Sequence, residues 1–408
     1  MPAARRSVNP FRVLVVHRNF RLFWSGQTVS LVGTWMQSVA LGWLTLLLTD
    51  SVFLVGLVAA VGSFPVLVLS LPAGVLADRV DRLRLIIGTQ VLFGVQATLL
   101  WWVTWTGHVT VGWLLALATM SGVLQAVDVP ARQSMIMELV GREDLVDAIA
   151  LNSTGFNLAR IVGPGLAGIL IAKLGIAWCF GLNAVSYVAV LVGLFLIHRV
   201  TAPPPPATVS PVEGMLQGLR YIRDTRTVSV LVRQTAVFSV FGIPYLTLMP
   251  VYARDGLGLD AGGYGVLLSA VGVGAVVGAL SLAAFGNQLR RGRLLYAALF
   301  TFAAALLALA FAGTMQVAVA VLLVAGLAMI VNNALTNGLL QTISPDALRG
   351  RVMSAYSLVF IGMSPIGSLL AGATARSVGV AQTLAAGALI VAGYAAYTYT
   401  RHPAVREL

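Results

Sequence analysis

Long apolar stretches, each ended by a short polar turn, follow one another along almost the whole chain. A helix needs roughly 20 apolar residues to cross the hydrocarbon core of a membrane, and twelve stretches reach about that length. The pattern therefore predicts an all-α polytopic membrane protein with twelve transmembrane helices. The predicted spans are 20–48, 52–77, 84–106, 109–131, 144–172, 176–197, 227–253, 262–287, 293–312, 315–340, 348–374 and 378–399.

One polar connection, residues 198–226, is much longer than the others and contains the extended proline run TAPPPPATVSP. The segment after the prolines predicts a short helix on the membrane surface. The chain therefore divides into an N-terminal six-helix bundle (1–197), a linker and a C-terminal six-helix bundle (227–408). The apolar residues that recur at helical spacing in the linker are Met215, Leu216, Leu219 and Ile222.

The two bundles also resemble each other in sequence. A shift of 204 residues places VGPGLAG (162–168) on IGSLLAG (366–372), with four identical positions among seven. The same shift aligns the charged segments 142–147 and 346–351. A duplicated six-helix unit is the plan of transporters whose substrate path lies between two halves. We therefore expect two pseudo-symmetric bundles.

Composition and charge agree with a membrane protein. The chain is 58% hydrophobic and 10% charged, whereas soluble domains average roughly 25% charged residues. A net charge of +12 would suit nucleic acid, but the basic residues form short clusters between apolar spans, so no nucleic-acid partner is expected. The arginines gather on the side that holds both termini, which predicts cytoplasmic termini. The opposite connections hold only Lys173, Arg254 and Arg376.

The residues offer little for catalysis or metal binding. The single cysteine, Cys179, excludes an internal disulfide, and the four histidines are scattered without metal-ligand spacing. Neither the GxxxxGKS/T phosphate loop nor the GxSxG nucleophile turn occurs. We expect no cofactor, no metal and no enzyme activity, and therefore transport that is not driven directly by ATP hydrolysis.

The connection after the second predicted span reads GVLADRVDRLR (74–84). It resembles the signature loop of the major facilitator superfamily, G-x-L-A-D-R-x-x-R-x-R. Gly74 would allow close helix packing, and Asp78 at a helix end would face the positive N-terminus of a helix from the other half. Arg82 would pair with an acid at the same end of a neighbouring helix.

The segment VDVPARQSM supplies such an acid, since it places Asp128 and Arg132 one helical turn apart. The resemblance implies that Gly74, Asp78, Arg82, Asp128 and Arg132 form a cytoplasmic gate that stabilises the outward-facing state. The gate would meet the second half near 348–351. The equivalent loop of the second half has Asn287 where an aspartate is expected, so the latch would be one-sided.

Two further stretches, 17–44 and 127–153, look like the branch of the superfamily that contains enterobactin exporters and some multidrug efflux proteins. The resemblance implies a secondary-active, proton-coupled exporter of drugs or siderophore-like molecules in a bacterial inner membrane. Its partners would be the lipid bilayer, protons and a small organic substrate, and it would work as a monomer by alternating access. A lysophospholipid or lipid transporter, or a non-transporting membrane sensor, are the alternatives.

The fifth span contains ARIVGPGLAG (159–168), which resembles the glycine–proline motif in the fifth helix of antiporter-type members. Gly163, Pro164, Gly165 and Gly168 would thin and kink this helix. It would then pack tightly where the two halves meet. The resemblance favours an exporter over an importer.

Arg160 stands near the middle of the same span, where a charge costs at least ~2.5 kcal/mol unless it faces a polar interior. No carboxylate is expected at its depth, because Asp128 would lie on the order of 15–20 Å closer to the cytoplasm. Water, neutral side chains or an anionic substrate must therefore satisfy Arg160. Asp128, the most embedded carboxylate of the first half, is the candidate for carrying the coupled proton.

Neutral polar residues form stripes on the first, fifth, tenth and eleventh spans, together with aromatic and sulfur-containing side chains. Polar stripes inside a membrane face a protein interior or a wet cavity. The candidate substrate cavity comprises Gln27, Thr34, Trp35, Gln37, Asn152, Asn157, Arg160, Asn332, Asn333, Asn337, Tyr356 and Met363.

Overall fold

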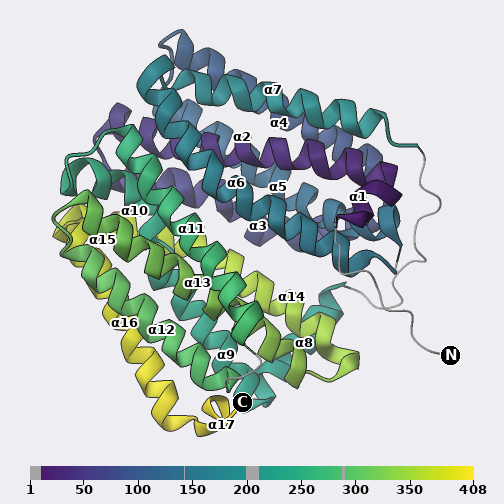
Figure 1. Cartoon of the computed structure of the whole chain (residues 1–408), viewed down its shortest axis with the longest axis vertical. Helices are drawn as coiled ribbons and strands as arrows, with labels where there is room; N and C mark the ends of the chain where they lie inside the picture. The colour runs from purple at the N-terminus through teal and green to yellow at the C-terminus, as the bar shows by residue number, and fades with distance from the viewer. Residues whose placement is uncertain (1–10, 142, 199–210, 287–289) are drawn as a thin grey trace.

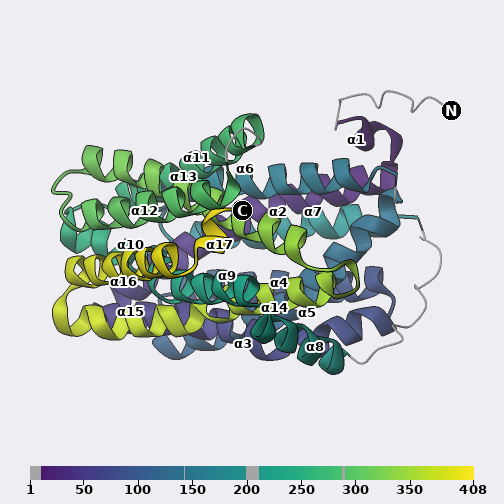
Figure 2. The same ribbon diagram turned by 90° about the horizontal axis from the view of Figure 1, so that it is seen from below.

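The computed structural model describes residues 11–408 except 142, 199–210 and 287–289, and it describes no side chains at 71, 75, 77–79, 211, 212, 214 and 347. Within this part of the chain, twelve helical segments are long and apolar enough to cross a membrane. They run roughly side by side along one direction in two perpendicular views (Figures 1 and 2). The predicted all-α fold class with twelve spans is therefore confirmed.

The first half of the chain folds into one helix for each predicted span, preceded by a single short helix. Asp50 ends the first span in the left-handed conformation (φ 48°), and the Ser51 side chain then caps the next helix by accepting the N–H of Leu54. The helices are α1 (Arg12–Val16), α2 (Arg18–Thr49), α3 (Val52–Arg79), α4 (Arg82–Trp105), α5 (Val111–Val140), α6 (Leu145–Leu174) and α7 (Ala177–Phe195).

The second half has the same number of spans, but two of them are broken where a continuous helix was predicted. Pro244 and Pro365 lie at these breaks, and each lacks the N–H that an unbroken helix would use. The elements are α8 (Pro211–Asp224), α9 (Arg226–Val237), η1 (Phe238–Gly242), α10 (Tyr245–Val251), η2 (Tyr252–Gly256), α11 (Ala261–Phe285), α12 (Arg291–Ala310), α13 (Met315–Ile343), α14 (Asp346–Gly362), α15 (Ser364–Val378), α16 (Val380–Arg401) and α17 (Pro403–Arg406).

Helix α5 is longer than predicted, because it continues through Pro130 and ends at Gly141, whose φ of 71° no other residue adopts easily. Asp128 consequently lies 12 residues from the end of its helix, about 18 Å along the axis. Arg160 lies 15 residues from the start of α6, about 23 Å along it. The expected difference of 15–20 Å in depth between these two residues is therefore wrong.

The two ends of the helical bundle differ. We call the end that carries α8 and α17 the termini end, and the end that carries Asp50 and Arg254 the far end. Figure 1 shows the helices of the two halves converging at the far end, on its left, and the second half fanning away toward the termini end. An ion pair between Asp50 and Arg254 joins the halves at the far end.

Glycines allow the backbones of the two halves to meet. A Cβ added to Gly168 of α6 would lie 3.0 Å from the Ala261 carbonyl oxygen and from the Gly262 Cα of α11. A Cβ added to Gly56 of α3 would lie 2.7 Å from the Ser368 carbonyl oxygen of α15. The helix pairs α6–α11 and α3–α15 therefore form the closest contacts between the halves.

Candidate functional site

A cavity of about 510 Å³ lies in the first half of the protein. One face of α2, one face of α5 and a short part of α3 form its wall, and α4, α6 and α7 each contribute an aromatic side chain. Of the predicted cavity residues, Gln27, Thr34, Trp35 and Gln37 line it. The polar residues that share this wall are Gln27, Ser30, Thr34, Gln37, Ser38, Ser63, Ser121, Gln125, Arg132 and Tyr187.

Two aromatic pairs border the cavity. Trp35 and Phe156 meet edge to face with ring centroids 5.8 Å apart, and Phe93 stacks on Tyr187 at 5.7 Å. Flat apolar walls of this kind suit ring-containing organic molecules. Trp35 is among the predicted cavity residues, but Phe93 and Tyr187 are not, because nothing in an apolar span distinguishes a cavity-facing aromatic side chain from one facing lipid.

A buried network of hydrogen bonds joins α2, α4, α5 and α7 of the first half. Gln37 donates to Gln96 of α4 at 3.1 Å and accepts from Asn183 of α7 at 2.9 Å. Gln96 in turn donates to the Leu117 carbonyl oxygen of α5, and Ser186 donates to Asn183. The amide of Gln37 is therefore engaged in holding helices together, although part of its side chain borders the cavity. By contrast, Oε1 of Gln27 is buried without a hydrogen-bond partner among the described residues.

Asp128 is fully buried on α5, with 0% of its surface exposed. Its Oδ1 accepts hydrogen bonds from Thr89 Oγ1 at 2.7 Å and Gln90 Nε2 at 2.9 Å, both on α4. Its Oδ2 forms an ion pair with Arg132, and Arg132 also lines the cavity. Thr89 and Gln90 were not among the predicted site residues, although two adjacent polar residues in an apolar span are a usable signal.

Arg160 pairs with a neutral side chain, one of the three kinds of partner that its position in the sequence allowed. Its Nη2 donates to Asn157 of its own helix at 2.9 Å, and it interacts electrostatically with the Tyr245 hydroxyl of the other half. Its Nε is buried without an acceptor in the described part of the chain. A Cβ added to Gly272 of α11 would lie 3.1 Å from the Arg160 carbonyl oxygen. Arg160 therefore stands where the two halves meet.

The remaining predicted cavity residues do not line the 510 Å³ cavity. On α13, Asn332 donates to Asn333 at 3.3 Å, and Asn337 accepts from Gln341 at 2.6 Å. Tyr356 is buried against Phe360, Met363 stands at the break between α14 and α15, and Asn152 is half-buried on α6. Five of these residues belong to the second half, whereas all the residues that line the cavity belong to the first.

The predicted gate residues are distributed along α3, α4 and α5. Arg82 forms an ion pair with Glu138, whereas Asp128 was the predicted partner. The reason is position, since Arg82 opens α4 at the termini end, level with the end of α5, whereas Asp128 lies deeper. The side chain of Asp78 lies outside the described residues. A Cβ added to Gly74 would meet no described atom within 4 Å, so no described residue packs closely against it in this conformation.

The start of α14, expected to meet the gate, contacts the linker helix. Nη1 of Arg351 donates to Gln217 of α8, and a Cβ on Gly218 would lie 2.7 Å from the Arg351 carbonyl oxygen. Arg349 donates to the Gln341 carbonyl oxygen at 2.8 Å. The described partners of these two arginines therefore belong to the linker and the second half.

The glycine–proline motif of α6 faces two neighbours. A Cβ on Gly163 would lie 2.6 Å from the Trp35 Cβ, and one on Gly165 would lie 3.2 Å from the Ser269 Oγ of α11. The Pro164 carbonyl oxygen approaches Gly265 so closely that a Cβ there would lie 2.5 Å from it. The motif consequently brings α6 against α2 within the first half and against α11 across the interface.

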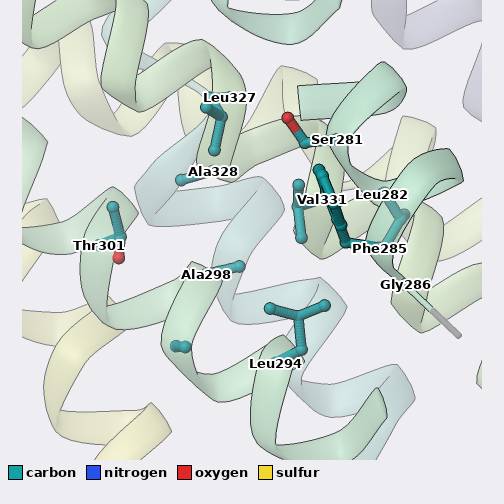
Figure 3. Close-up of a pocket in the computed structure, with 11 residues that line it drawn as sticks. Ser281, Leu282, Phe285, Gly286, Leu294, Ala298, Thr301, Leu327, Ala328 and Val331 are labelled. Carbon is teal, nitrogen blue, oxygen red and sulfur yellow. The ribbon is translucent and has the colours of Figure 1, made fainter. Parts of the chain in front are cut away.

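A second cavity, of about 240 Å³, lies between α11, α12 and α13 and is shown in Figure 3. Leu282, Phe285 and Leu294 are among the side chains around it, and Ser281 and Thr301 are its polar lining residues. It lacks a charged lining residue in the described chain and belongs to the second half alone. The larger cavity, with its mixed lining and Arg132, is the better candidate for a binding site.

Comparison with known proteins places the chain among transporters. The family model described as transmembrane secretion effector matches residues 7–408. The staphyloferrin A transporter of Staphylococcus aureus is 26% identical over 89% of this chain and 91% of its own length. The multidrug efflux pump Tap of Mycolicibacterium fortuitum is 27% identical over 87% and 88%, and the enterobactin exporter EntS of Shigella flexneri is 27% identical over 92% and 90%.

Solved structures share the fold. The nucleoside transporter NupG superposes with a TM-score of 0.74 at 12% identity, covering 96% of this chain and 99% of its own. A bacterial homolog of the human lysosomal transporter Spinster, in an inward-facing and unoccupied conformation, superposes with a TM-score of 0.69 at 15% identity, covering 98% and 97%. These likenesses extend over nearly the whole chain and therefore include both six-helix halves.

Proposed function

The chain belongs to the transmembrane secretion effector family of major facilitator superfamily transporters, and we propose on that premise that it exports drugs or siderophore-like organic molecules by alternating access. The observation that carries the proposal is the 510 Å³ cavity with its mixed aromatic and polar wall. The names of the relatives, two siderophore transporters and a multidrug pump, agree with a substrate of this size and kind.

The conformation fits one stage of such a cycle. Close glycine contacts and the Asp50–Arg254 ion pair hold the halves together at the far end, and the helices diverge toward the termini end (Figure 1). The arginine clusters favour the termini end as the cytoplasmic one. With that orientation, the cavity would receive its substrate from the cytoplasm. One chain holds the whole path, so we propose that the monomer is the working unit.

We propose that Asp128 carries the coupled proton. It is a fully buried carboxylate about 18 Å from the end of α5, and Arg132 beside it lines the cavity. Its described neighbours are Thr89 and Gln90 of α4, Arg132 of its own helix and, through an electrostatic interaction, Tyr187 of α7. An intramembrane carboxylate next to a substrate cavity is suited to alternate between charged and neutral forms.

The purified protein in liposomes, with a panel of cationic, neutral and anionic aromatic dyes, tests the function. We expect accumulation of at least one dye that rises when a pH gradient is imposed. Asp128→Asn should abolish the response to the gradient while dye exchange without a gradient continues. If no dye moves in either direction but labelled lysophospholipid does, the chain is a lipid transporter. If nothing moves, the transport proposal itself is wrong.

A further inference from the structure

Among the cavity-lining residues that the structure describes, Arg132 is the one with a full charge. It extends the face of α5 that also carries Ser121, Gln125 and Val129, at the termini-end limit of the cavity. Its side chain is 19% exposed, so it is both reachable from the cavity and partly shielded from water. A cation in such a place attracts anions more strongly than one at a wet surface.

Asp128 forms an ion pair with Arg132, but Arg132 is not its only partner. The Thr89 hydroxyl and the Gln90 amide both donate to Oδ1 of Asp128, while Arg132 approaches Oδ2 through Nη2. A guanidinium has five N–H donors in a planar fork, so one contact leaves donors for a second partner. Because α4 supplies two hydrogen bonds to Asp128, Arg132 has room to share its charge with a ligand.

The positions of Asp128 and Arg132 relative to the cavity determine whether the site binds anions or cations. Asp128 is 0% exposed and lies behind Arg132, so a molecule in the cavity meets the guanidinium first. A cationic ligand would have to displace Arg132 to reach the carboxylate. Arg160 offers no equivalent site, because it stands at the interface of the halves and does not line this cavity.

We propose that the cavity selects aromatic organic anions, with a carboxylate or sulfonate of the substrate paired to Arg132 and its rings against Trp35 and Phe156. Bidentate pairing of a guanidinium with a planar anionic group supplies the charge recognition, and the edge-to-face pair supplies the apolar wall. Asp128 then acts as an internal competitor that holds Arg132 in place until the substrate arrives. This assignment rests on the proposed transport function and names its substrate class.

The test measures binding to the purified full chain in a neutral detergent, using naphthalene-2-sulfonate and its neutral analogue naphthalene-2-sulfonamide. We expect the wild type to prefer the sulfonate by at least tenfold, a difference of about 1.4 kcal/mol. Asp128→Asn should strengthen sulfonate binding and leave sulfonamide binding unchanged, because it removes the competitor. Arg84 and Asp81 form an exposed ion pair outside the cavity, so Arg84→Gln/Asp81→Asn is the matched control for removing an arginine–aspartate pair.

Arg132→Gln alone would leave Asp128 buried without its cation, which risks misfolding. The double variant Arg132→Gln/Asp128→Asn removes both charges and avoids this problem. It should bind both probes equally. A sulfonate preference that survives in the double variant, or that disappears in Arg160→Gln while Arg132 is present, overturns the assignment. Dye transport in liposomes without any preference for anions would also overturn it, while leaving the transport function intact.

Discussion

The contact between α6 and α11 predicts a shift in conformation when Gly168 gains a methyl group. The added Cβ would lie 3.0 Å from the Ala261 carbonyl oxygen and the Gly262 Cα, whereas ordinary contacts begin at 3.4 Å. Both of these are backbone atoms, so neither can relieve the steric conflict by a change of side-chain rotamer. Overpacking of this kind costs about 1–3 kcal/mol. Since about 1.4 kcal/mol changes an equilibrium tenfold, Gly168→Ala should favour the state with the far end open by roughly five- to more than a hundredfold.

Electron spin resonance distance measurements check this shift. Spin labels at Leu48→Cys and Ser377→Cys, in a Cys179→Ala background, report the distance between the halves at the far end. We expect Gly168→Ala to add a longer distance to the distribution. The control is Gly88→Ala on α4, whose Cβ would meet no described atom within 4 Å. An unchanged distribution in Gly168→Ala, or an equal change in both variants, would show that the α6–α11 contact does not hold the far end closed.

Three further variants test separate parts of the structure. Asp50→Asn should open the far end only slightly, because its pair with Arg254 is exposed and such pairs contribute about 0.2–1 kcal/mol; salt should mimic the effect in the same distance measurement. Asn183→Ala should lower stability by about 1–3 kcal/mol, because it leaves Oε1 of Gln37 buried without its donor, and a melting experiment in detergent shows whether it does. Arg160→Ala should abolish dye transport while yield and melting temperature stay near the wild type; an equal loss of folded protein would instead assign it a structural role.

The number and order of the spans followed from hydrophobic length alone, because crossing the hydrocarbon core imposes that length on every helix. The breaks at Phe238–Gly242 and at Met363 did not, because hydrophobic length does not register a proline; Pro244 and Pro365, which lie at these breaks, were the available signals. The predicted end of α5 lies nine residues before the observed one, because the residues after Ala131 are polar enough to look like a connection. A proline inside a membrane helix is tolerated when neighbouring groups satisfy the freed carbonyl.

The candidate site was only partly predictable, because the sequence shows which helices carry polar residues but not which of these residues face the cavity. The polar stripe of α2 pointed to the cavity, because polar side chains in an apolar helix must face protein or water. The polar residues of α13 also lie in an apolar helix, but they hydrogen-bond to one another and do not line the cavity. Which face of each helix meets the cavity depends on helix rotation and on packing between spans distant in sequence. The pairing of Arg82 with Glu138 depends on the same packing.

Blocking the cavity directly tests whether it is the transport path. Ser38 is exposed and lines the cavity, whereas Val68 of α3 is 55% exposed and lies outside its wall. Each is replaced by cysteine in the Cys179→Ala background and modified with a bulky maleimide, and dye transport into liposomes is measured. We expect modification at Ser38→Cys to stop transport and modification at Val68→Cys to leave it unchanged. Undiminished transport after complete modification of Ser38→Cys would contradict it.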